Sequence, residues 1–200
     1  MRLLRAWAVH EARVWRALRM WLLRRRDGVG GDVRGFGYAR AQASTWYGVL
    51  FVLVVETVGM SFFTAPYPAL HWVMLAADLY TLLLLLGMHA ACVVRPHTVG
   101  PEGLRIRQGA RLDVTIPAHL IVSVRRELAF PHGKAEEGVL DVPVAAQTSL
   151  TVELAEPVPV VRLGGRREEV RTVRVHADDA AGAVAAIEGV RAAARTADAA

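Results

Sequence analysis

Two acidic side chains stand inside long apolar stretches of this 200-residue chain, and they are its clearest candidates for chemistry. Glu56 lies in the run 45–64 and Asp78 in the run 69–94, and neither run contains Lys or Arg. A charged carboxylate in such surroundings costs about 2.5–3.5 kcal/mol on membrane-insertion scales. We therefore expect at least one of the two to be protonated, and two carboxyl groups that share a site to titrate as a coupled pair.

Two histidines accompany Asp78. On a helix, His71, Asp78 and His89 fall within about 40° of one another. A functional interpretation of these residues is a proton or cation path, or a haem or metal site; the alternative is polar contact between helices. His71 and His89 are about 27 Å apart along a helix, too far to bind one ion, so we expect no metal, cofactor or catalytic residue.

The apolar runs that hold these residues predict two transmembrane helices. A hydrocarbon layer about 30 Å thick needs about 20 apolar residues, and the runs supply 20 and 26. Pro66 and Pro68 lie between them and favour a tight antiparallel hairpin. Glu56 and Asp78 are then about 15 and 18 Å from the turn, at similar depth, where they could face each other.

Charge is distributed very unevenly along the chain. Residues 1–44 carry a net +7, residues 45–94 carry −2, and residues 95–200 are neutral. Arginines flank the hairpin at its open end and none lies at its turn, so the positive-inside rule predicts a plasma-membrane protein with both termini in the cytoplasm. The single cysteine, Cys92, excludes an intrachain disulfide.

Residues 1–26 have the pattern of a basic amphipathic helix lying in the membrane surface. Trp7, Trp15 and Trp21 share one face, whereas the opposite face carries Arg2, Arg5, Arg13, Arg16 and Arg19. The expected contacts are the bilayer and its anionic headgroups; packing on the chain's own cytoplasmic domain is the alternative. A nucleic-acid-binding arm is disfavoured because a Trp-rich face has no role on a phosphate backbone. Residues 27–44, rich in glycine, are expected to form a linker.

After Arg95 the pattern changes to short alternating apolar stretches, which predict a β domain over residues 95–200. Asp178 or Asp179 is expected to cap a closing helix that continues to about Arg195, and residues 130–138 are expected to form a surface loop. The expected apolar strand positions are Leu104 and Ile106; Leu112, Val114 and Ile116; Val122 and Val124; Leu150, Val152 and Leu154; 158–163; and 171–175.

Several features of the chain resemble bacterial PH-like domains of the YdbS-like type in small membrane proteins. They are the two preceding hydrophobic runs, the segments Gly-Leu-Arg-Ile-Arg-Gln-Gly (103–109) and Ile-Pro-Ala-His-Leu-Ile-Val-Ser-Val (116–124), and the Asp-Asp start of the last helix. With 23 Arg against one Lys, the whole chain also looks like uncharacterised actinobacterial integral membrane proteins. The resemblance implies an α+β membrane protein, in which a transmembrane hairpin precedes a small PH-like β-sandwich or barrel closed by a C-terminal helix. It implies no activity.

No catalytic motif of the Gly-x-Ser-x-Gly, His-x-x-x-His or Cys-x-x-Cys type occurs in the sequence. We therefore expect a non-enzymatic membrane scaffold or assembly protein that forms homo- or hetero-oligomers through the hairpin and does not bind nucleic acid. The alternative is a small ion- or proton-conducting or transporter subunit that uses Glu56 and Asp78.

Overall fold

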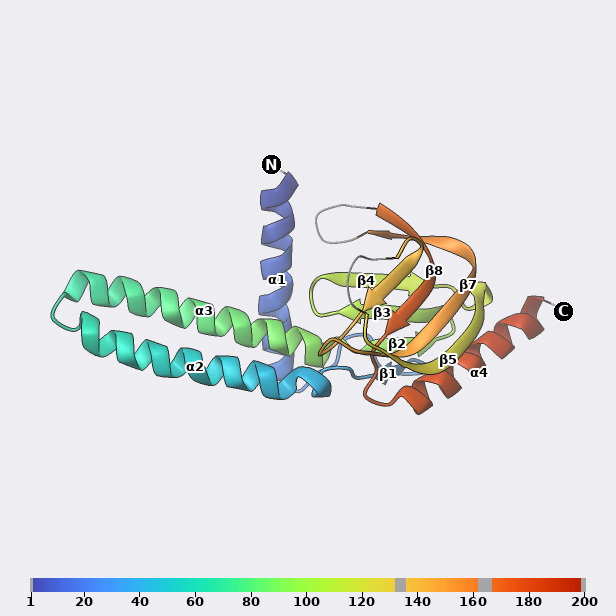
Figure 1. Cartoon of the computed structure of the whole chain (residues 1–200), viewed down its shortest axis with the longest axis horizontal. Helices are drawn as coiled ribbons and strands as arrows, with labels where there is room; N and C mark the ends of the chain where they lie inside the picture. Colours follow the sequence, from blue (N-terminus) through green and yellow to red (C-terminus); the bar gives the residue numbers. More distant parts are fainter. Residues whose placement is uncertain (1, 132–135, 162–166, 199–200) are drawn as a thin grey trace.

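Two long helices, α2 (Arg40–Thr64) and α3 (Pro68–Val94), form an antiparallel hairpin that projects from a β domain (Figure 1). The computed structural model describes residues 2–131, 136–161 and 167–198. Within these residues, α2 and α3 are the two helices long and apolar enough to cross a membrane. Their bounds agree closely with the predicted runs, except that α2 begins earlier.

The early start of α2 has a tertiary cause. The carboxylate of Asp178, which lies at the end of the β domain, accepts a hydrogen bond from the backbone N–H of Arg40 at 3.4 Å. An acidic side chain at a helix N-terminus accepts a hydrogen bond from a free N–H group, and its negative charge interacts favourably with the helix dipole. A residue 138 positions away in the sequence therefore caps this helix.

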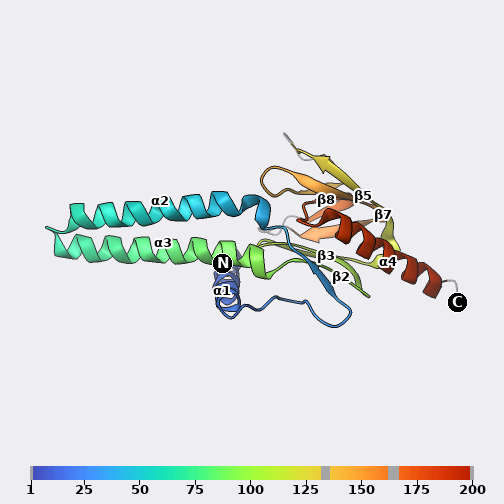
Figure 2. The ribbon, with the colours of Figure 1, turned by 90° about the horizontal axis from the view of Figure 1, so that it is seen from below.

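Helix α1 (Arg2–Leu22) runs across the hairpin and packs on α3 near the β domain (Figures 1 and 2). The contact is close because Gly87 of α3 has no side chain: a Cβ atom there would lie 2.6 Å from Cγ1 of Val14. Val14 is fully buried, whereas Trp7 exposes 67% of its surface. The apolar face of α1 is thus divided between the hairpin and the outside. Packing on the hairpin was not among the expected contacts, and the contact of the exposed part with a membrane stays a prediction.

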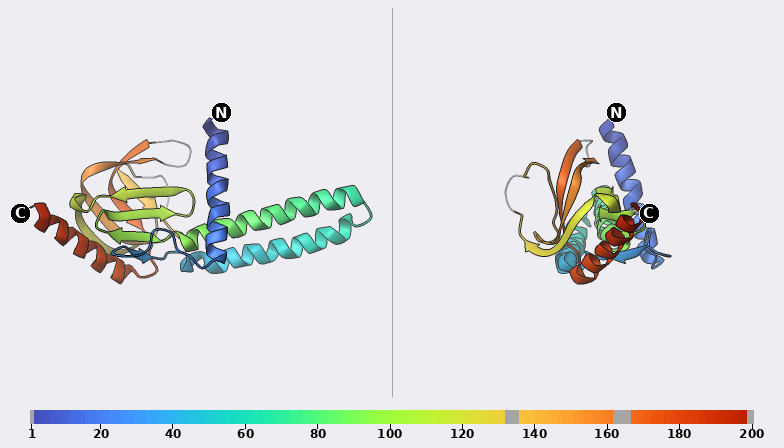
Figure 3. Two further views of the ribbon diagram at one scale, coloured as in Figure 1. Left: turned by 180° about the vertical axis from the view of Figure 1, so that it is seen from behind. Right: turned by 90° about the vertical axis from the view of Figure 1, so that its right-hand side faces the viewer.

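The β domain consists of two four-stranded sheets around one core (Figure 3). The first sheet has the order β1-β2-β3-β4 and the second the order β5-β7-β8-β6. The strands are β1 (Arg34–Phe36), β2 (His97–Gly100), β3 (Gly103–Gln108), β4 (Leu112–Ile116), β5 (Ile121–Ala129), β6 (Val139–Val142), β7 (Thr148–Val161) and β8 (Arg167–Val175), with a 3-10 turn at Ala118–Leu120.

The predicted alternation is confirmed on β3, β4 and the first half of β7, whose alternate apolar residues are buried. It is wrong at Val122, which is 46% exposed. The register of β5 against β7 shifts between Ile121 and Ser123, and a bulge of this kind turns one side chain to the other face. The expected strand 158–163 is a continuation of β7 after a second irregularity, and its last two residues lie outside the described residues.

The expected linker contains a strand that the sequence did not reveal. Residues Arg34–Phe36 form β1 and pair with β2 of the β domain. Gly35 lets Val29 pack closely on this strand, because a Cβ there would lie 2.6 Å from Cγ2 of Val29. The expected loop 130–138 includes Phe130, which is exposed; residues 132–135 lie outside the described residues.

The closing helix is confirmed as α4 (Ala180–Asp198), and its cap is Asp179. The Asp179 carboxylate accepts a hydrogen bond of 2.9 Å from the N–H of Gly182. The buried Ile187 and Ala183 place one face of α4 on the common core of the two sheets. The two neighbouring aspartates therefore cap two different helices, Asp178 capping α2 and Asp179 capping α4.

The contact between Val14 and Gly87 predicts that Gly87→Val releases α1 from the hairpin. Overpacking of this kind costs about 1–3 kcal/mol, and the arginines of a released α1 become accessible to trypsin. We expect faster tryptic cleavage of α1 in detergent micelles, measured by mass spectrometry. Gly48→Val is the matched control, since no atom lies within 4 Å of a Cβ at Gly48. Equal cleavage rates in both variants would contradict the packing.

Candidate functional site

Of the polar residues predicted within the hairpin, His71 and His89 lie near opposite ends of α3. Glu56 is exposed on α2 and Asp78 is half-buried on α3. Within the described part of the chain, no hydrogen bond or ion pair is found between them, so their interaction stays a prediction. His71 Nδ1 lies 3.1 Å from Thr64 Oγ1 near the turn, whereas His89 is buried close to the rings of Trp46 and Tyr47 at the other end. Over the described residues, no group of three or more potential metal ligands is found.

The arginines predicted to contact the membrane surface divide into two groups. Arg13 donates to the carbonyl of Ala110 in the β3–β4 turn at 3.4 Å, and Arg16 lies 3.8 Å from the carboxylate of Asp27. Arg13 therefore contacts the β domain, and Arg16 contacts the segment that follows α1. Arg19 is exposed, and the side chains of Arg2 and Arg5 lie outside the described residues.

The predicted tryptophans of α1 also differ in their surroundings. Trp15 donates to Glu11 at 3.3 Å, and the same carboxylate oxygen accepts from Tyr80 of α3 at 2.7 Å. Hydrogen bonding by Tyr80 lowers the pKa of Glu11. Trp21 packs partly buried beside Ala17 and Ala91, and Trp7 is exposed.

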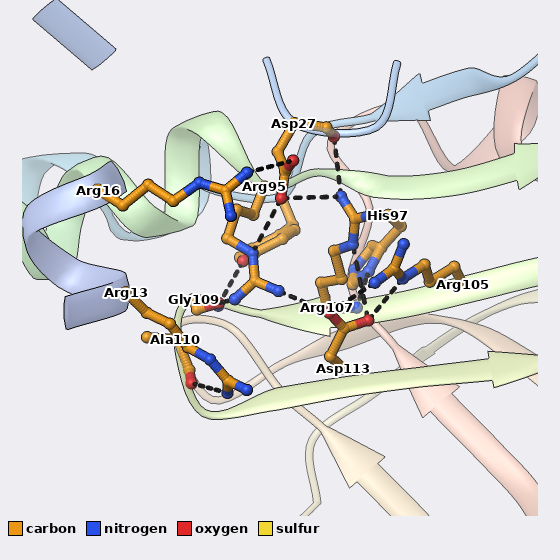
Figure 4. A network of polar contacts seen from close by, with 11 residues as sticks. Arg13, Arg16, Asp27, Arg95, His97, Arg105, Arg107, Gly109, Ala110 and Asp113 are labelled. Atoms are coloured by element: carbon orange, nitrogen blue, oxygen red, sulfur yellow. Dashed lines mark hydrogen bonds and ion pairs between the residues drawn. The ribbon is translucent and has the colours of Figure 1, made fainter. Parts of the chain in front are cut away.

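The most connected polar site is a cluster of arginines and aspartates at the junction of α1, α3 and the first sheet, which we call the junction cluster (Figure 4). Its centre is Asp27. The N–H of Asp27 donates to the last carbonyl of α3, at Val94, at 2.8 Å. Its carboxylate lies 3.8 Å from Arg16, 3.6 Å from Arg95 and 4.0 Å from Arg107. Asp27 thus connects α1, α3 and β3.

Asp113 on β4 is the second acid of the junction cluster. It accepts two hydrogen bonds from Arg105, at 2.6 and 2.9 Å, and one from Arg95 at 2.6 Å. Burial alone would raise the pKa of Asp113, but the hydrogen bonds from Arg105 and the nearby positive charges lower it below its ordinary value. The same hydrogen bonds raise the pKa of Arg105.

Arg107 is the buried member of the junction cluster, with 1% of its side chain exposed. It lies opposite Asp113 in the β3–β4 ladder, and its Nε is 3.7 Å from that carboxylate. Its Nη1 donates to the backbone carbonyl of Asp27 at 2.8 Å. Burial lowers the pKa of Arg107, so the two carboxylates must offset the cost of keeping its charge away from water.

Gly28 makes this burial possible. It has a φ of +68°, and a Cβ there would lie 2.7 Å from Nη2 of Arg107. A residue without a side chain therefore allows the backbone that follows α1 to close over the guanidinium. A glycine that was expected to provide flexibility in a linker instead fits against a charged side chain.

The junction cluster surrounds a pocket of ≈ 300 Å³. Its charged lining residues are Arg13, Arg16, Arg95, Arg105, Arg107, Asp27 and Asp113. Five arginines against two aspartates leave a net charge of +3. The chemistry that such a lining supports is the binding of an anion.

Sequence reasoning did not identify the junction cluster, although a signal was present. Arg105 and Arg107 alternate with Leu104 and Ile106, so both arginines lie on the face of β3 away from the core. Arg107 and Asp113 are also equally distant from Ala110, which is the centre of the hairpin, and this symmetry predicts them as a cross-strand pair. Asp27 carried no such signal, because its role depends on the tertiary position of α1.

A buried histidine lies beneath the junction cluster. His97 on β2 accepts a hydrogen bond at Nδ1 from the N–H of Arg107, at 3.1 Å, and its Nε2 lies 3.0 Å from the carbonyl of His176. Both contacts are satisfied only by the neutral imidazole with its proton on Nε2. Burial, opposed by the hydrogen bond to His176, lowers the pKa of His97 to about 4. Tyr38 stacks on this ring, 4.7 Å away.

The comparisons with known proteins gave no match: no family model, no curated protein and no solved structure is similar to this chain at a significant level. The functional argument therefore depends on the geometry of the chain's own residues.

His97 predicts how stability depends on pH. Because the pKa of this base is lower in the folded state than its ordinary value of 6.5, the unfolded chain binds more protons between pH 6.5 and 4, and stability falls as pH falls through that range. We expect the free energy of unfolding of the full chain in micelles to decrease by about 2 kcal/mol from pH 7 to pH 5. Denaturant titration followed by circular dichroism measures this change.

The matched control for this prediction is His97→Gln, which can donate and accept hydrogen bonds but does not titrate. This variant should lose most of the pH dependence. The smaller part that persists should come from His176, whose pKa burial also lowers. An unchanged pH dependence in His97→Gln would rule out His97 as the source.

Proposed function

We propose that this chain is an integral membrane adaptor, in which the hairpin spans the bilayer and holds a PH-like β domain at the cytoplasmic surface for a protein partner. One observation carries the proposal: the burial of α3 changes abruptly at Gly87. Residues 68–86 include no buried residue, whereas Gly87, His89, Ala90, Ala91 and Val94 are buried. Ala91 and Val94 pack with Ala17 of α1, and His89 lies beside Trp46 and Tyr47 of α2. Pro68 and Gly87 are 19 residues apart, about 29 Å along a helix. This length matches a hydrocarbon layer about 30 Å thick.

The side chains on the exposed part of the hairpin support the same arrangement. Phe62 and Phe63 expose 78% and 80% of their surfaces, and Phe51 exposes 69%. An exposed apolar surface of this extent needs an apolar environment. In a bilayer, α1 would lie across α3 at the depth of the interface, with exposed Trp7 available to the acyl region.

The distribution of arginine supports an orientation with both termini in the cytoplasm. Arg24, Arg25, Arg26 and Arg95 lie at the base of the hairpin, and the turn 65–67 carries no charge. Positive residues are retained on the cytoplasmic side of a plasma membrane. The β domain, joined to the base, would then lie at the cytoplasmic face.

The adaptor part of the proposal depends on the surface of the β domain. Strand β5 is an edge strand of the second sheet, and near its end Leu128 and Phe130 expose 64% and 54% of their surfaces. Exposed apolar residues beside a sheet edge are typical of protein-binding surfaces. The two sheets and α4 are consistent with a small β domain closed by a C-terminal helix. The PH-like resemblance would add a family to this architecture, but it implies no activity.

Cysteine accessibility tests the topology. With a membrane-impermeant maleimide applied to intact bacterial cells, Ala65→Cys at the turn should react, whereas Glu156→Cys on the exposed surface of β7 should react only after permeabilisation. The unsubstituted chain, whose only cysteine is half-buried Cys92, gives the background. Labelling of Glu156→Cys in intact cells would overturn the orientation, and recovery of the chain in the soluble fraction would overturn the membrane location.

A second candidate function is an ion- or proton-conducting subunit, and the exposure of Glu56 favours it. This carboxyl lies on the outer surface of α2, where a charge is costly in lipid. Gly48 and Gly59, which the helical period places on the same face, have no atom within 4 Å of a Cβ position. A neighbouring helix from another copy or another protein would fit on this face and remove Glu56 from lipid.

Glu56→Gln separates the two candidate functions. If Glu56 only holds subunits together, Glu56→Gln should weaken the association between copies by less than tenfold, about 1 kcal/mol, as measured by chemical crosslinking in native membranes. Neither the original chain nor the variant should then conduct protons. If Glu56 conducts, a pH-dependent proton flux into vesicles containing the purified chain should disappear while crosslinking persists. Glu156→Gln makes the same chemical change outside the hairpin and should alter neither measurement.

A further inference from the structure

The pocket of the junction cluster is lined by the arginine face of α1, the end of α3, and strands β3 and β4 (Figure 4). These elements come from three separate parts of the sequence, and their convergence produces the net charge of +3 described above. At ≈ 300 Å³ the pocket has the size of a small-ligand site. Arg13 and Arg16 lie on a helix, and Arg105, Arg107 and Asp113 lie on paired strands, which favours a defined anion geometry.

The two aspartates do not satisfy all of the arginines. Asp113 is occupied by close hydrogen bonds from Arg105 and Arg95, and both acids face the buried Arg107. Among the described residues, Arg16 has a single polar contact, of 3.8 Å to Asp27, and 65% of its side chain is exposed. Arg13, over the same part of the chain, has one polar contact, of 3.4 Å with a backbone carbonyl. Each guanidinium has five N–H donors, so α1 offers unused donors at the mouth of the pocket.

One of the deeper groups also lacks a partner. Nε of Arg107 is buried and makes no hydrogen bond within the described structure. A buried charged group with an unused donor is costly. An anion that enters between Arg16 and Arg105 adds negative charge near this guanidinium and lowers that cost.

We propose that the pocket of the junction cluster binds a phosphate group, with α1 supplying Arg13 and Arg16 and the β domain supplying Arg105. Planar guanidinium groups form paired hydrogen bonds with phosphate oxygens. The source is either the headgroup of an anionic phospholipid or soluble phosphate, and the position of the pocket favours the lipid. It lies beside Val94, beyond the 29 Å of α3 that we assign to the hydrocarbon layer, which is the level of the headgroups. The lipid source rests on the proposed membrane function.

Lipid titration into the purified full chain tests the proposal. In micelles of a neutral detergent, phosphatidylglycerol should raise the thermal unfolding midpoint saturably and phosphatidylcholine should not. The double variant Arg13→Gln, Arg16→Gln should bind phosphatidylglycerol about tenfold more weakly. The double variant Arg126→Gln, Arg171→Gln removes the same charge from exposed residues of the β domain outside the pocket, and its affinity should be unchanged. Circular dichroism of each variant verifies that the chain is folded.

A second titration distinguishes the two sources. Inorganic phosphate, compared with sodium chloride at equal ionic strength, should stabilise the chain only weakly if the ligand is a lipid. Strong stabilisation by inorganic phosphate alone, lost in Arg13→Gln, Arg16→Gln, assigns the pocket to soluble phosphate. Equal weakening of lipid binding in both double variants would mean diffuse charge attraction and would overturn the proposal, as would the absence of saturable binding of either ligand. These outcomes are independent of the maleimide experiment, which tests the membrane function.

Discussion

The buried guanidinium of Arg107 is the constraint on which the junction of this molecule depends. Removing a charge from water costs several kcal/mol, and the cost is offset only when counter-charges and hydrogen bonds surround it. Here Asp113 comes from the neighbouring strand and Asp27 from the segment after α1. The charge therefore requires α1, the hairpin and the first sheet to meet at one place, and loss of either carboxylate would leave it with a single counter-charge.

The second connection between hairpin and β domain is made at Asp178. Its carboxylate caps α2, while its backbone N–H donates to the carbonyl of Gly37 at 2.8 Å. Asp27 serves the end of α3 in a comparable way, because its N–H satisfies the carbonyl of Val94. Both helices of the hairpin thus have their β-domain ends completed by residues outside the hairpin. Such attachment suits an adaptor, because it fixes the orientation of the β domain relative to α2 and α3.

Elements governed by local periodicity could be predicted from the sequence, and elements governed by tertiary contacts could not. The apolar runs predicted α2 and α3 within five residues, and alternation predicted β3 and β4 with the correct buried faces. Strand β1 was missed because three residues carry no periodicity and its pairing partner, β2, lies about 60 residues later in the chain. Val122 was assigned to the wrong face because a bulge breaks the alternation. The junction cluster was visible only in part: the hairpin symmetry relates Arg107 to Asp113, but nothing local relates either residue to Asp27.

The uneven distribution of charge acquires a physical explanation from this geometry. The arginines near the base of the hairpin outnumber the acids of the junction cluster. A network of ion pairs that served only to hold the structure together would need equal numbers of positive and negative charges. Excess charge is costly in a folded chain unless something outside the chain compensates it. In the proposed arrangement the membrane surface provides that compensation, because anionic headgroups lie at the level of the pocket. Glu56 on α2 carries the opposite charge in the apolar part of the hairpin, where no Lys or Arg is present. Its negative charge must be removed by a proton or balanced by a group on a neighbouring helix. Under the proposed function, both departures from local charge balance are compensated by partners outside this chain.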